Sequence, residues 1–247
     1  MSRIFTFISA MLWFGLAVAA SGHGPAMQPS NIDLSDQLSL QRGARVFVNY
    51  CVSCHSASFM RYNRIAEDLD LSEESVQTNL MFTTDKIGEA MEVAMRPADA
   101  ESWFGAPPPD LSVVARSRGP DWLYNFLITF YVDDNRPTGV NNLFFKDTAM
   151  PHALWELQGL QRAVYHTETT HDGKETSTIE RLELSERGSL TENEYKRLVR
   201  DLVGFLVYVG EPAKLVRHRL GFWVLVFLLV FLVATYLMKR EYWKDVH

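Results

Sequence analysis

Cys51-Val52-Ser53-Cys54-His55 is the stretch that decides how this 247-residue chain is organised, because it contains both of the chain's cysteines. Thioredoxin-like redox pairs share the C-x-x-C spacing, but a histidine directly after the second cysteine is typical of c-type haem attachment. A structural zinc site would need further thiolate or imidazole ligands, and the chain has no second cysteine pair. The stretch therefore predicts one covalently attached haem c.

Each residue of this motif has a predicted chemical task. The thiols of Cys51 and Cys54 add to the two vinyl groups of the porphyrin as thioethers, since two intervening residues let one turn of backbone reach both. His55 then lies next to the iron, where its neutral imidazole acts as the proximal axial ligand. Cys51, Cys54 and His55 are accordingly the predicted cofactor-binding residues, with His55 also a metal ligand.

The second axial ligand is predicted from a loop near the end of the soluble region. Met150 is followed by Pro151, which has no backbone N–H and stiffens the segment that presents the thioether. His152 lies two residues away and is the alternative ligand. The pattern favours Met150, and a thioether would give a higher reduction potential than a second imidazole. Core or helix-surface positions are expected for four other methionines: Met60, Met81, Met91 and Met95.

Two apolar segments indicate export and membrane anchoring. Residues 4–20 follow Arg3 and end in small residues, as a cleavable signal peptide does, so residues 1–20 are predicted to be removed; a short membrane anchor is the alternative. Leu220 to Met238 contains no charge and, as a helix, would span roughly 28 Å, close to the thickness of a bilayer core. We expect an exported domain over 21–213, a polar neck over 214–219, a transmembrane helix over 220–238 and a cytoplasmic tail over 239–247.

The exported region is acidic. Residues 21–213 contain 28 Asp and Glu against 17 Lys and Arg. Such a balance attracts a basic protein more readily than a nucleic acid. The densest acidic run, Glu67 to Glu74, could dock such a partner, and a solvated helix face is an equally good interpretation.

Two helices are predicted to form the centre of this domain. Ser39 is expected to cap a helix from Leu40 to about Tyr50, in which Gly43 leaves a gap for close approach of another helix. Thr191 and Glu194 fit a capping box that begins a second helix, which ends near residues 210–212. We expect the two helices to cross near Gly43.

The remaining segments predict shorter elements. Residues 112–119 and 122–131 are expected to be helical, the acidic run 67–74 to open a helix, and 106–111 and 133–142 to be loops. Residues 163–168 and 176–184 are compatible with a β-hairpin around the turn at 170–173. The predicted fold is mainly α: a c-type cytochrome domain with inserted loops and a possible hairpin, followed by one transmembrane helix.

Five motifs are distributed along the mature chain: Gly43-x-x-x-Phe47-x-x-Tyr50-Cys51-x-x-Cys54-His55-Ser56, Pro108-Pro109-Asp110-Leu111-Ser112, Arg116-Ser117-Arg118, Arg136 to Asn142 and Met150 to Trp155. Together they resemble the cytochrome c1 family, and the similarity covers essentially the whole mature chain. The C-x-x-C-H motif alone would specify only a c-type cytochrome; the Pro-Pro-Asp-Leu-Ser segment and the C-terminal anchor make the resemblance specific.

The resemblance implies a subunit of ubiquinol–cytochrome c reductase, the respiratory complex III, in a bacterial inner membrane. Such a subunit takes an electron from the Rieske iron–sulfur protein beside cytochrome b and passes it to a soluble c-type cytochrome, within a dimeric complex. The isolated chain would be an electron carrier, and enzyme activity would belong to the complex. The resemblance also implies Met150 as an axial ligand and Arg118 near a haem propionate, with Arg116 as the other candidate for that role.

Two alternatives remain open from the sequence. The chain could be a membrane-anchored cytochrome that serves a terminal oxidase or a dehydrogenase instead. It could also be an enzyme with its own haem chemistry, such as a peroxidase, which would need a displaceable sixth ligand.

Overall fold

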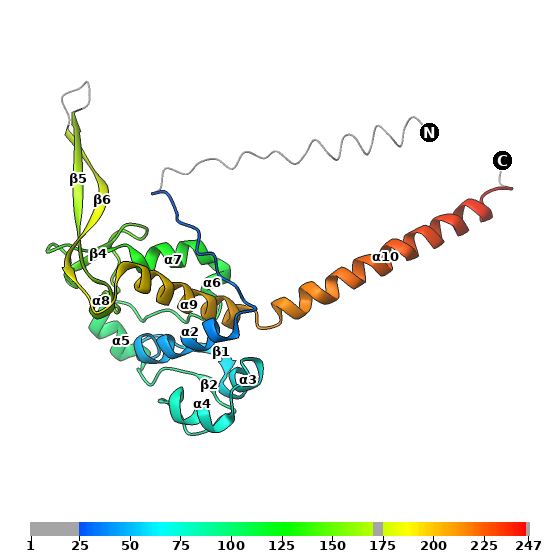
Figure 1. Cartoon of the computed structure of the whole chain (residues 1–247), viewed down its shortest axis with the longest axis horizontal. Coiled ribbons are helices and arrows are strands. Elements are labelled where there is room, and N and C mark those ends of the chain that lie inside the picture. The colour runs from blue at the N-terminus through cyan, green and yellow to red at the C-terminus, as the bar shows by residue number, and fades with distance from the viewer. Residues whose placement is uncertain (1–24, 170–174, 246–247) are drawn as a thin grey trace.

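Helices α2 (Gln37–Tyr50) and α9 (Glu192–Gly210) pack across each other at the centre of the computed structural model, which describes residues 25–169 and 175–245 (Figure 1). The predicted signal peptide, residues 1–20, lies outside the described residues. The capping box of α9 is confirmed: the Thr191 hydroxyl accepts from the Glu194 amide, and the Glu194 carboxylate accepts from the Thr191 amide. Each helix of the α2–α9 pair is thus defined by signals in its own segment, although the two segments lie far apart in the chain.

The predicted start of the first helix was wrong by three residues. Asp36, and not Ser39, caps α2, because the Asp36 carboxylate accepts from the Ser39 amide at 3.0 Å. The Ser39 hydroxyl instead donates to Asp201 on α9, whose carboxylate also pairs with Arg42. Asp36 is the better cap because it leaves the Ser39 hydroxyl for this contact between the helices.

The close crossing at Gly43 is confirmed. A Cβ atom at this position would collide with the main-chain carbonyl oxygen of Asp201 and with the Cβ of Phe205. The absence of a side chain therefore lets the two helix backbones approach, and the rings of Phe47 and Phe205 pack beside the crossing at 5.7 Å between centroids.

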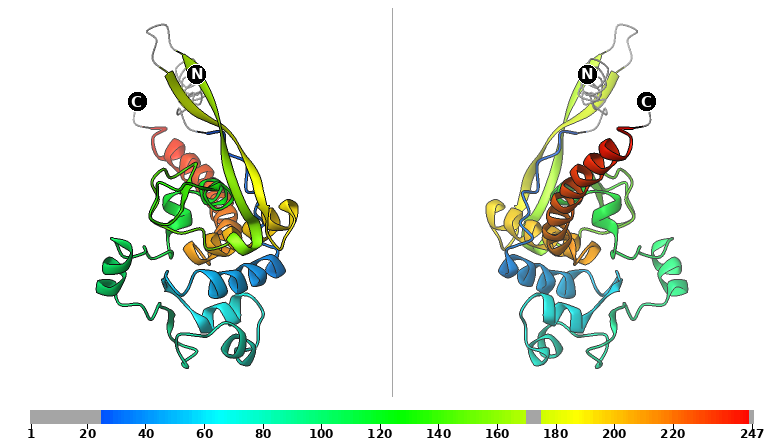
Figure 2. Two further views of the ribbon diagram at one scale, coloured as in Figure 1. Left: turned by 90° about the vertical axis from the view of Figure 1, so that its left-hand side faces the viewer. Right: turned by 90° about the vertical axis from the view of Figure 1, so that its right-hand side faces the viewer.

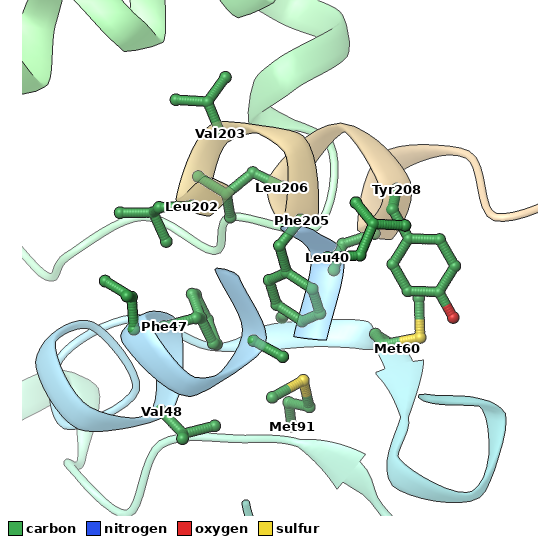
Figure 3. Close-up of a cluster of buried hydrophobic side chains, with 14 of the residues drawn as sticks. Leu40, Phe47, Val48, Met60, Met91, Leu202, Val203, Phe205, Leu206 and Tyr208 are labelled. Carbon is green, nitrogen blue, oxygen red and sulfur yellow. The ribbon is translucent and has the colours of Figure 1, made fainter. Parts of the chain in front are cut away.

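One large cluster of buried side chains forms the core around this crossing. Figure 3 shows it between α2 and α9 and the strands below them. Burying each large apolar side chain contributes roughly 1.5–3 kcal/mol, so this cluster is the main source of stability. The labelled members are Leu40, Phe47, Val48, Met60, Met91, Leu202, Val203, Phe205, Leu206 and Tyr208. Met60 and Met91 are thus core residues, as predicted.

A second part of the domain lies beneath α2 (Figures 1 and 2). It comprises β1 (Ala57–Arg61), α3 (Tyr62–Asp68), α4 (Glu73–Asn79) and β2 (Ala90–Met91), with β1 antiparallel to β2. The helix α5 (Pro97–Phe104) lies to one side of this part (Figure 2). The acidic run 67–74 ends α3 and begins α4, where the Ser72 hydroxyl accepts from the Ser75 amide. The predicted helix opening in this run is confirmed.

The segment that follows differs from the sequence prediction. The helix expected over 112–119 is only the short α6 (Val114–Ser117), and the next helix, α7 (Pro120–Ile128), ends before Tyr131. The chain instead forms β3 (Phe130–Val132), paired with β4 (Val140–Asn142) at the end of the predicted loop. Phe130, Tyr131 and Val132 favour a strand, and α7 ends because this strand finds a partner ten residues later.

The predicted hairpin is confirmed and is longer than expected. After the short α8 (Trp155–Gln158), β5 (Gly159–Thr169) pairs antiparallel with β6 (Glu175–Arg187), with irregularities in register at two points. The turn predicted at 170–173 lies outside the described residues. The hairpin projects from the domain (Figures 1 and 2), and its base contacts β3.

A long C-terminal helix, α10 (Lys214–Tyr242), begins soon after α9 ends. Within residues 25–169 and 175–245 it is the one helix long and apolar enough to cross a membrane. Its apolar side chains are exposed, and it extends away from the domain (Figure 1). The predicted neck, 214–219, is its first part, and Arg217 in it pairs with Glu211.

Candidate haem site

The C-x-x-C-H motif forms a single turn at the C-terminal end of α2. The amides of Cys51 and Val52 both donate to the Phe47 carbonyl, which continues the helical pattern. The Cys51 carbonyl then accepts from the Cys54 amide at 3.0 Å and from the His55 amide at 2.8 Å. Because bonds of this spacing close a helix-like turn, Cys51, Cys54 and His55 lie on the same side of the chain.

The ring of His55 is buried and its orientation is fixed. Its Nδ1–H donates to the carbonyl oxygen of Pro109 at 2.7 Å, which leaves Nε2 as the nitrogen available to a metal. Burial lowers the pKa of His55, although the bond to Pro109 opposes this shift. His55 is therefore a neutral imidazole with one nitrogen committed to the protein, as a metal ligand requires.

The Pro-rich segment holds this arrangement from the other side. The Asp110 carboxylate accepts from the amide and hydroxyl of Ser58 and from the amide of Ser112, while the Leu111 amide donates to the Ser56 carbonyl. Burial pulls the pKa of Asp110 upward, but these hydrogen bonds together lower it. Asp110 thus pins the segment to β1 and places the Pro109 carbonyl at His55.

The two thiols fit covalent haem attachment. Both are free, so the motif is not a disulfide. Burial of Cys51 raises the pKa of its thiol to about 12. Among the described residues no group of three or more His, Cys, Asp or Glu side chains is placed to hold a metal ion alone. Free thiols beside a neutral, oriented imidazole are the donors that a haem c needs.

Met150 belongs to a second, smaller cluster. It is half-buried and packs against Phe126, Phe130 and Val140, which come from α7, β3 and β4. The Met150 amide donates to the hydroxyl of the buried Thr148 at 3.3 Å. Met150 is therefore held by both side-chain packing and a local backbone contact.

His152, the alternative ligand, is buried. Its ring stacks on Phe130, with centroids 4.9 Å apart and planes 2° apart. Burial lowers its pKa to about 4. His152 is therefore a packed part of the loop that carries Met150, unlike His166 and His218, which are exposed.

The two arginines considered for a propionate contact point to different places. The Arg118 guanidinium lies over the rings of Trp122 and Phe145, at 5.0 Å and 5.9 Å from their centroids. Arg116 instead lies along α9, with its Cγ 3.4 Å from where a Cβ at Gly210 would be. Trp122 stacks on Phe126, so Arg118 is linked to the Met150 cluster and Arg116 is not.

The structure joins the predicted residues in two groups. Cys51, Cys54 and His55 form one with Pro109, and Met150 and Arg118 belong to the other through Trp122. The side chains of Trp122 and Leu127 pack against both hydrophobic clusters, so the two groups share one framework.

Sequence reasoning missed the polar residues that hold the Met150 loop. The Asn142 amide group donates to the Phe126 carbonyl and accepts from the Phe144 and Phe145 amides. Asn141 similarly accepts from the Asp147 amide. Both asparagines are almost fully buried. Their signal was the Asn-Asn pair at the end of the segment 133–142, which was predicted to be a loop and was otherwise used only for the family resemblance.

Comparison with known proteins places the chain in a family. The model of the Cytochrome C1 family matches residues 30–246. The chain is 50% identical to a cytochrome c1 of Allochromatium vinosum, over 94% of each chain, and 27% identical to that of Rhodospirillum rubrum, over 85% of this chain and 83% of the other. It is also 46% identical, over 96% of each chain, to a protein of Nitrosomonas europaea named ammonia monooxygenase gamma subunit.

The family match covers both groups of site residues and the C-terminal helix. The chain therefore belongs to the cytochrome c1 family, whose members carry a covalently bound haem c and form the haem subunit of complex III, beside cytochrome b and the Rieske protein.

Proposed function

We propose that this chain accepts an electron from a Rieske iron–sulfur protein and passes it to a soluble c-type cytochrome, as part of the quinol–cytochrome c reductase of a respiratory chain. The observation that carries the proposal is the C-x-x-C-H turn whose histidine is oriented by Pro109, in a chain of this family. When bound there, haem c supplies the one-electron iron couple. The protein supplies attachment, ligands and surroundings of fixed geometry.

The roles of the site residues follow from their positions. Cys51 and Cys54 would hold a bound haem c through two thioethers, His55 would ligate the iron through Nε2, and Met150 would supply the second ligand. Arg118 lies near a propionate, because its guanidinium belongs to the Met150 side of the site and has no ion pair among the described residues. The packing of His152 on Phe130 supports Met150 over His152 as ligand.

The proposal also gives the chain its place in the cell. Residues 1–20 are a signal peptide, 21–213 a periplasmic domain, 214–219 a neck, 220–238 a transmembrane helix and 239–247 a cytoplasmic tail of a bacterial inner-membrane protein. The exposed apolar surface of α10 supports the anchor. The complete complex is a dimer in this proposal.

Co-purification tests the proposed partners. When the tagged chain is extracted in mild detergent, cytochrome b and the Rieske protein should be recovered with it, and a pyridine haemochrome spectrum should show one haem c per chain. Recovery of the chain with haem c but without either protein would contradict the assignment to complex III.

The relative in Nitrosomonas europaea suggests a second candidate. Its name describes a subunit of ammonia monooxygenase, and the identity of 46% is nearly as high as that to a cytochrome c1. The same co-purification distinguishes the two, because a monooxygenase partner would then be recovered in place of cytochrome b.

The acidic run 67–74 is the proposed docking surface for a basic cytochrome, and the structure changes how it should be tested. Asp68 pairs with Arg64 at 2.8 Å and accepts from the Tyr208 hydroxyl at 2.9 Å, so it helps to hold α3 against α9. The four other carboxylates of the run are exposed: Glu67, Asp70, Glu73 and Glu74. Only these four are free to face a partner.

Neutralising those four residues to Gln, or to Asn at position 70, should slow electron transfer to a basic cytochrome about tenfold at low salt. The difference should vanish at high salt, because exposed charges are then screened. Asn at position 70 suits its φ of 52°. Stopped-flow oxidation of the chain measures the rate.

A control variant removes the same charge elsewhere, at Glu156, Glu180, Glu183 and Glu186, which are exposed around the hairpin. It should leave the low-salt rate unchanged. Equal slowing in both variants would show that the run 67–74 acts only through the net charge of the domain and is not a docking surface.

A further inference from the structure

Two buried polar atoms near Met150 have no hydrogen bond of standard geometry in the structure: Nε2 of His152 and Oε1 of Gln158. These two side chains are each other's hydrogen-bonding neighbours. A buried polar atom is costly to leave unpaired, so two such atoms on neighbouring side chains indicate a hydrogen bond that a small movement completes.

The orientation of the Gln158 amide is already fixed. Its Nε2 donates to the Ile128 carbonyl at 2.9 Å, at the end of α7. Gln161 donates to the same carbonyl and to that of Phe130. Gln158 therefore presents Oε1, an acceptor, and can pair only with a protonated Nε2 of His152.

The ring of His152 is fixed from a second direction. It lies parallel to the ring of Phe130, and Phe130 is also in the cluster that Met150 packs against. Met150 and His152 are separated only by Pro151, whose backbone is restricted. A constraint on the His152 ring is therefore transmitted to Met150 through a stiff segment of two peptide bonds.

We infer that His152 is a positioning residue: held between the Phe130 ring and the Gln158 amide, it keeps the thioether of Met150 at the haem iron. This inference rests on the proposed function, in which Met150 is the axial ligand. His152 itself does not ligate, because Nε2 is directed to Gln158 and ligation would require the stacked ring to leave Phe130.

Displacement of Met150 by cyanide tests this role in the haem-loaded, full-length chain in detergent. His152→Phe keeps the stacked ring and removes the N–H. Gln158→Leu removes the acceptor together with its donation to the Ile128 carbonyl, which still accepts from Gln161. Each should raise the association constant of cyanide for the ferric protein about fivefold to tenfold, the worth of one hydrogen bond. The double variant should match either single variant, because both remove the same bond.

His152→Ala, which also removes the ring contact, should raise cyanide binding further and weaken the thioether–iron absorption band. His166→Ala is the matched control, since His166 is exposed on β5, and should bind cyanide as the parent does. If His152→Ala yields no haem-loaded protein, the comparison rests on His152→Phe.

Parent-like cyanide binding in His152→Phe, or additive effects in the double variant, would overturn the inference. Met150→Leu in the same series distinguishes a failure of the positioning role of His152 from a failure of the proposed ligation by Met150. If Met150→Leu binds cyanide tightly while His152→Phe does not, only the positioning role fails. If Met150→Leu also behaves as the parent, the proposed ligation by Met150 fails instead.

Discussion

Replacing Met150 by leucine should lower the reduction potential of the haem-loaded chain by more than about 100 mV, a modest part of the roughly 0.8 V range that axial ligands cover. Leucine matches methionine in volume, so the contacts with Phe126, Phe130 and Val140 are kept and the chain still folds. Only the thioether is lost. About 59 mV changes the equilibrium constant of a one-electron transfer tenfold. The equilibrium constant for electron transfer from the Rieske protein should therefore fall by a factor of more than about 50.

Redox titration and the absorption band of the thioether–iron bond measure this change directly. Met95→Leu is the matched control: Met95 is half-buried, lies outside the helices and strands, and is far from Met150 in the chain. It should keep both the potential and the band. A Met150→Leu protein that kept the band would show that another side chain is the ligand. A low-spin spectrum of two imidazoles in the parent would show that a second histidine ligates, with His152 as the candidate.

Local signals predicted the parts of this molecule that need no distant partner. The C-x-x-C-H motif needs only one turn of backbone, and that turn is present at the end of α2. Thr191 and Glu194 are three residues apart, so their capping box could be predicted before the fold was known. The apolar run in α10 likewise depends only on composition.

Other features depend on contacts between distant segments, and these were missed. Ser39 looked like a helix cap, but its hydroxyl bonds to Asp201, 162 residues away, and Asp36 caps the helix instead. The end of α7 depends on strand pairing between Phe130 and Asn142. In the candidate site, the Pro109 carbonyl that orients His55 lies 54 residues further along the chain. Spacing alone could not predict it.

Gly43 is the exception: its contact with α9 is distant in sequence, yet a glycine within a predicted helix indicated it. A glycine in the middle of a helix costs about 1 kcal/mol relative to alanine, so its presence in α2 indicates a compensating contact. The structure supplies that contact: the main chain of α9 occupies the space of the missing side chain at Asp201 and Phe205. The helix gives up intrinsic stability, and the crossing gains close packing.

Gly43→Ala should therefore destabilise the chain, although alanine is the better helix former. The new methyl group meets a backbone carbonyl, which cannot rotate away, and overpacking of this kind costs about 1–3 kcal/mol or more. The gain in helix propensity offsets about 1 kcal/mol of that. Thermal unfolding followed by circular dichroism should show a lower midpoint than the parent.

Gly204→Ala is the matched control at the same interface. A Cβ at Gly204 would lie 3.6 Å from Cδ2 of Leu40, an ordinary contact with a flexible side chain, so this change should be neutral or stabilising by up to about 1 kcal/mol. Opposite signs for two identical substitutions would locate the effect in the crossing. If Gly43→Ala instead raised the midpoint as Gly204→Ala does, the approach of the helices would not depend on glycine.

The Gly43 substitution should also affect the haem site, because α2 carries the C-x-x-C-H turn directly at its end. A methyl group that separates α2 from α9 moves Cys51 and His55 relative to the segment 109–112, which is hydrogen-bonded to β1 and whose Ser112 carbonyl lies against Gly210 of α9. We therefore expect less covalently attached haem per chain in Gly43→Ala than in Gly204→Ala, measured by pyridine haemochrome. Lower stability with full haem content would show that the crossing supports the fold without setting the geometry of the site.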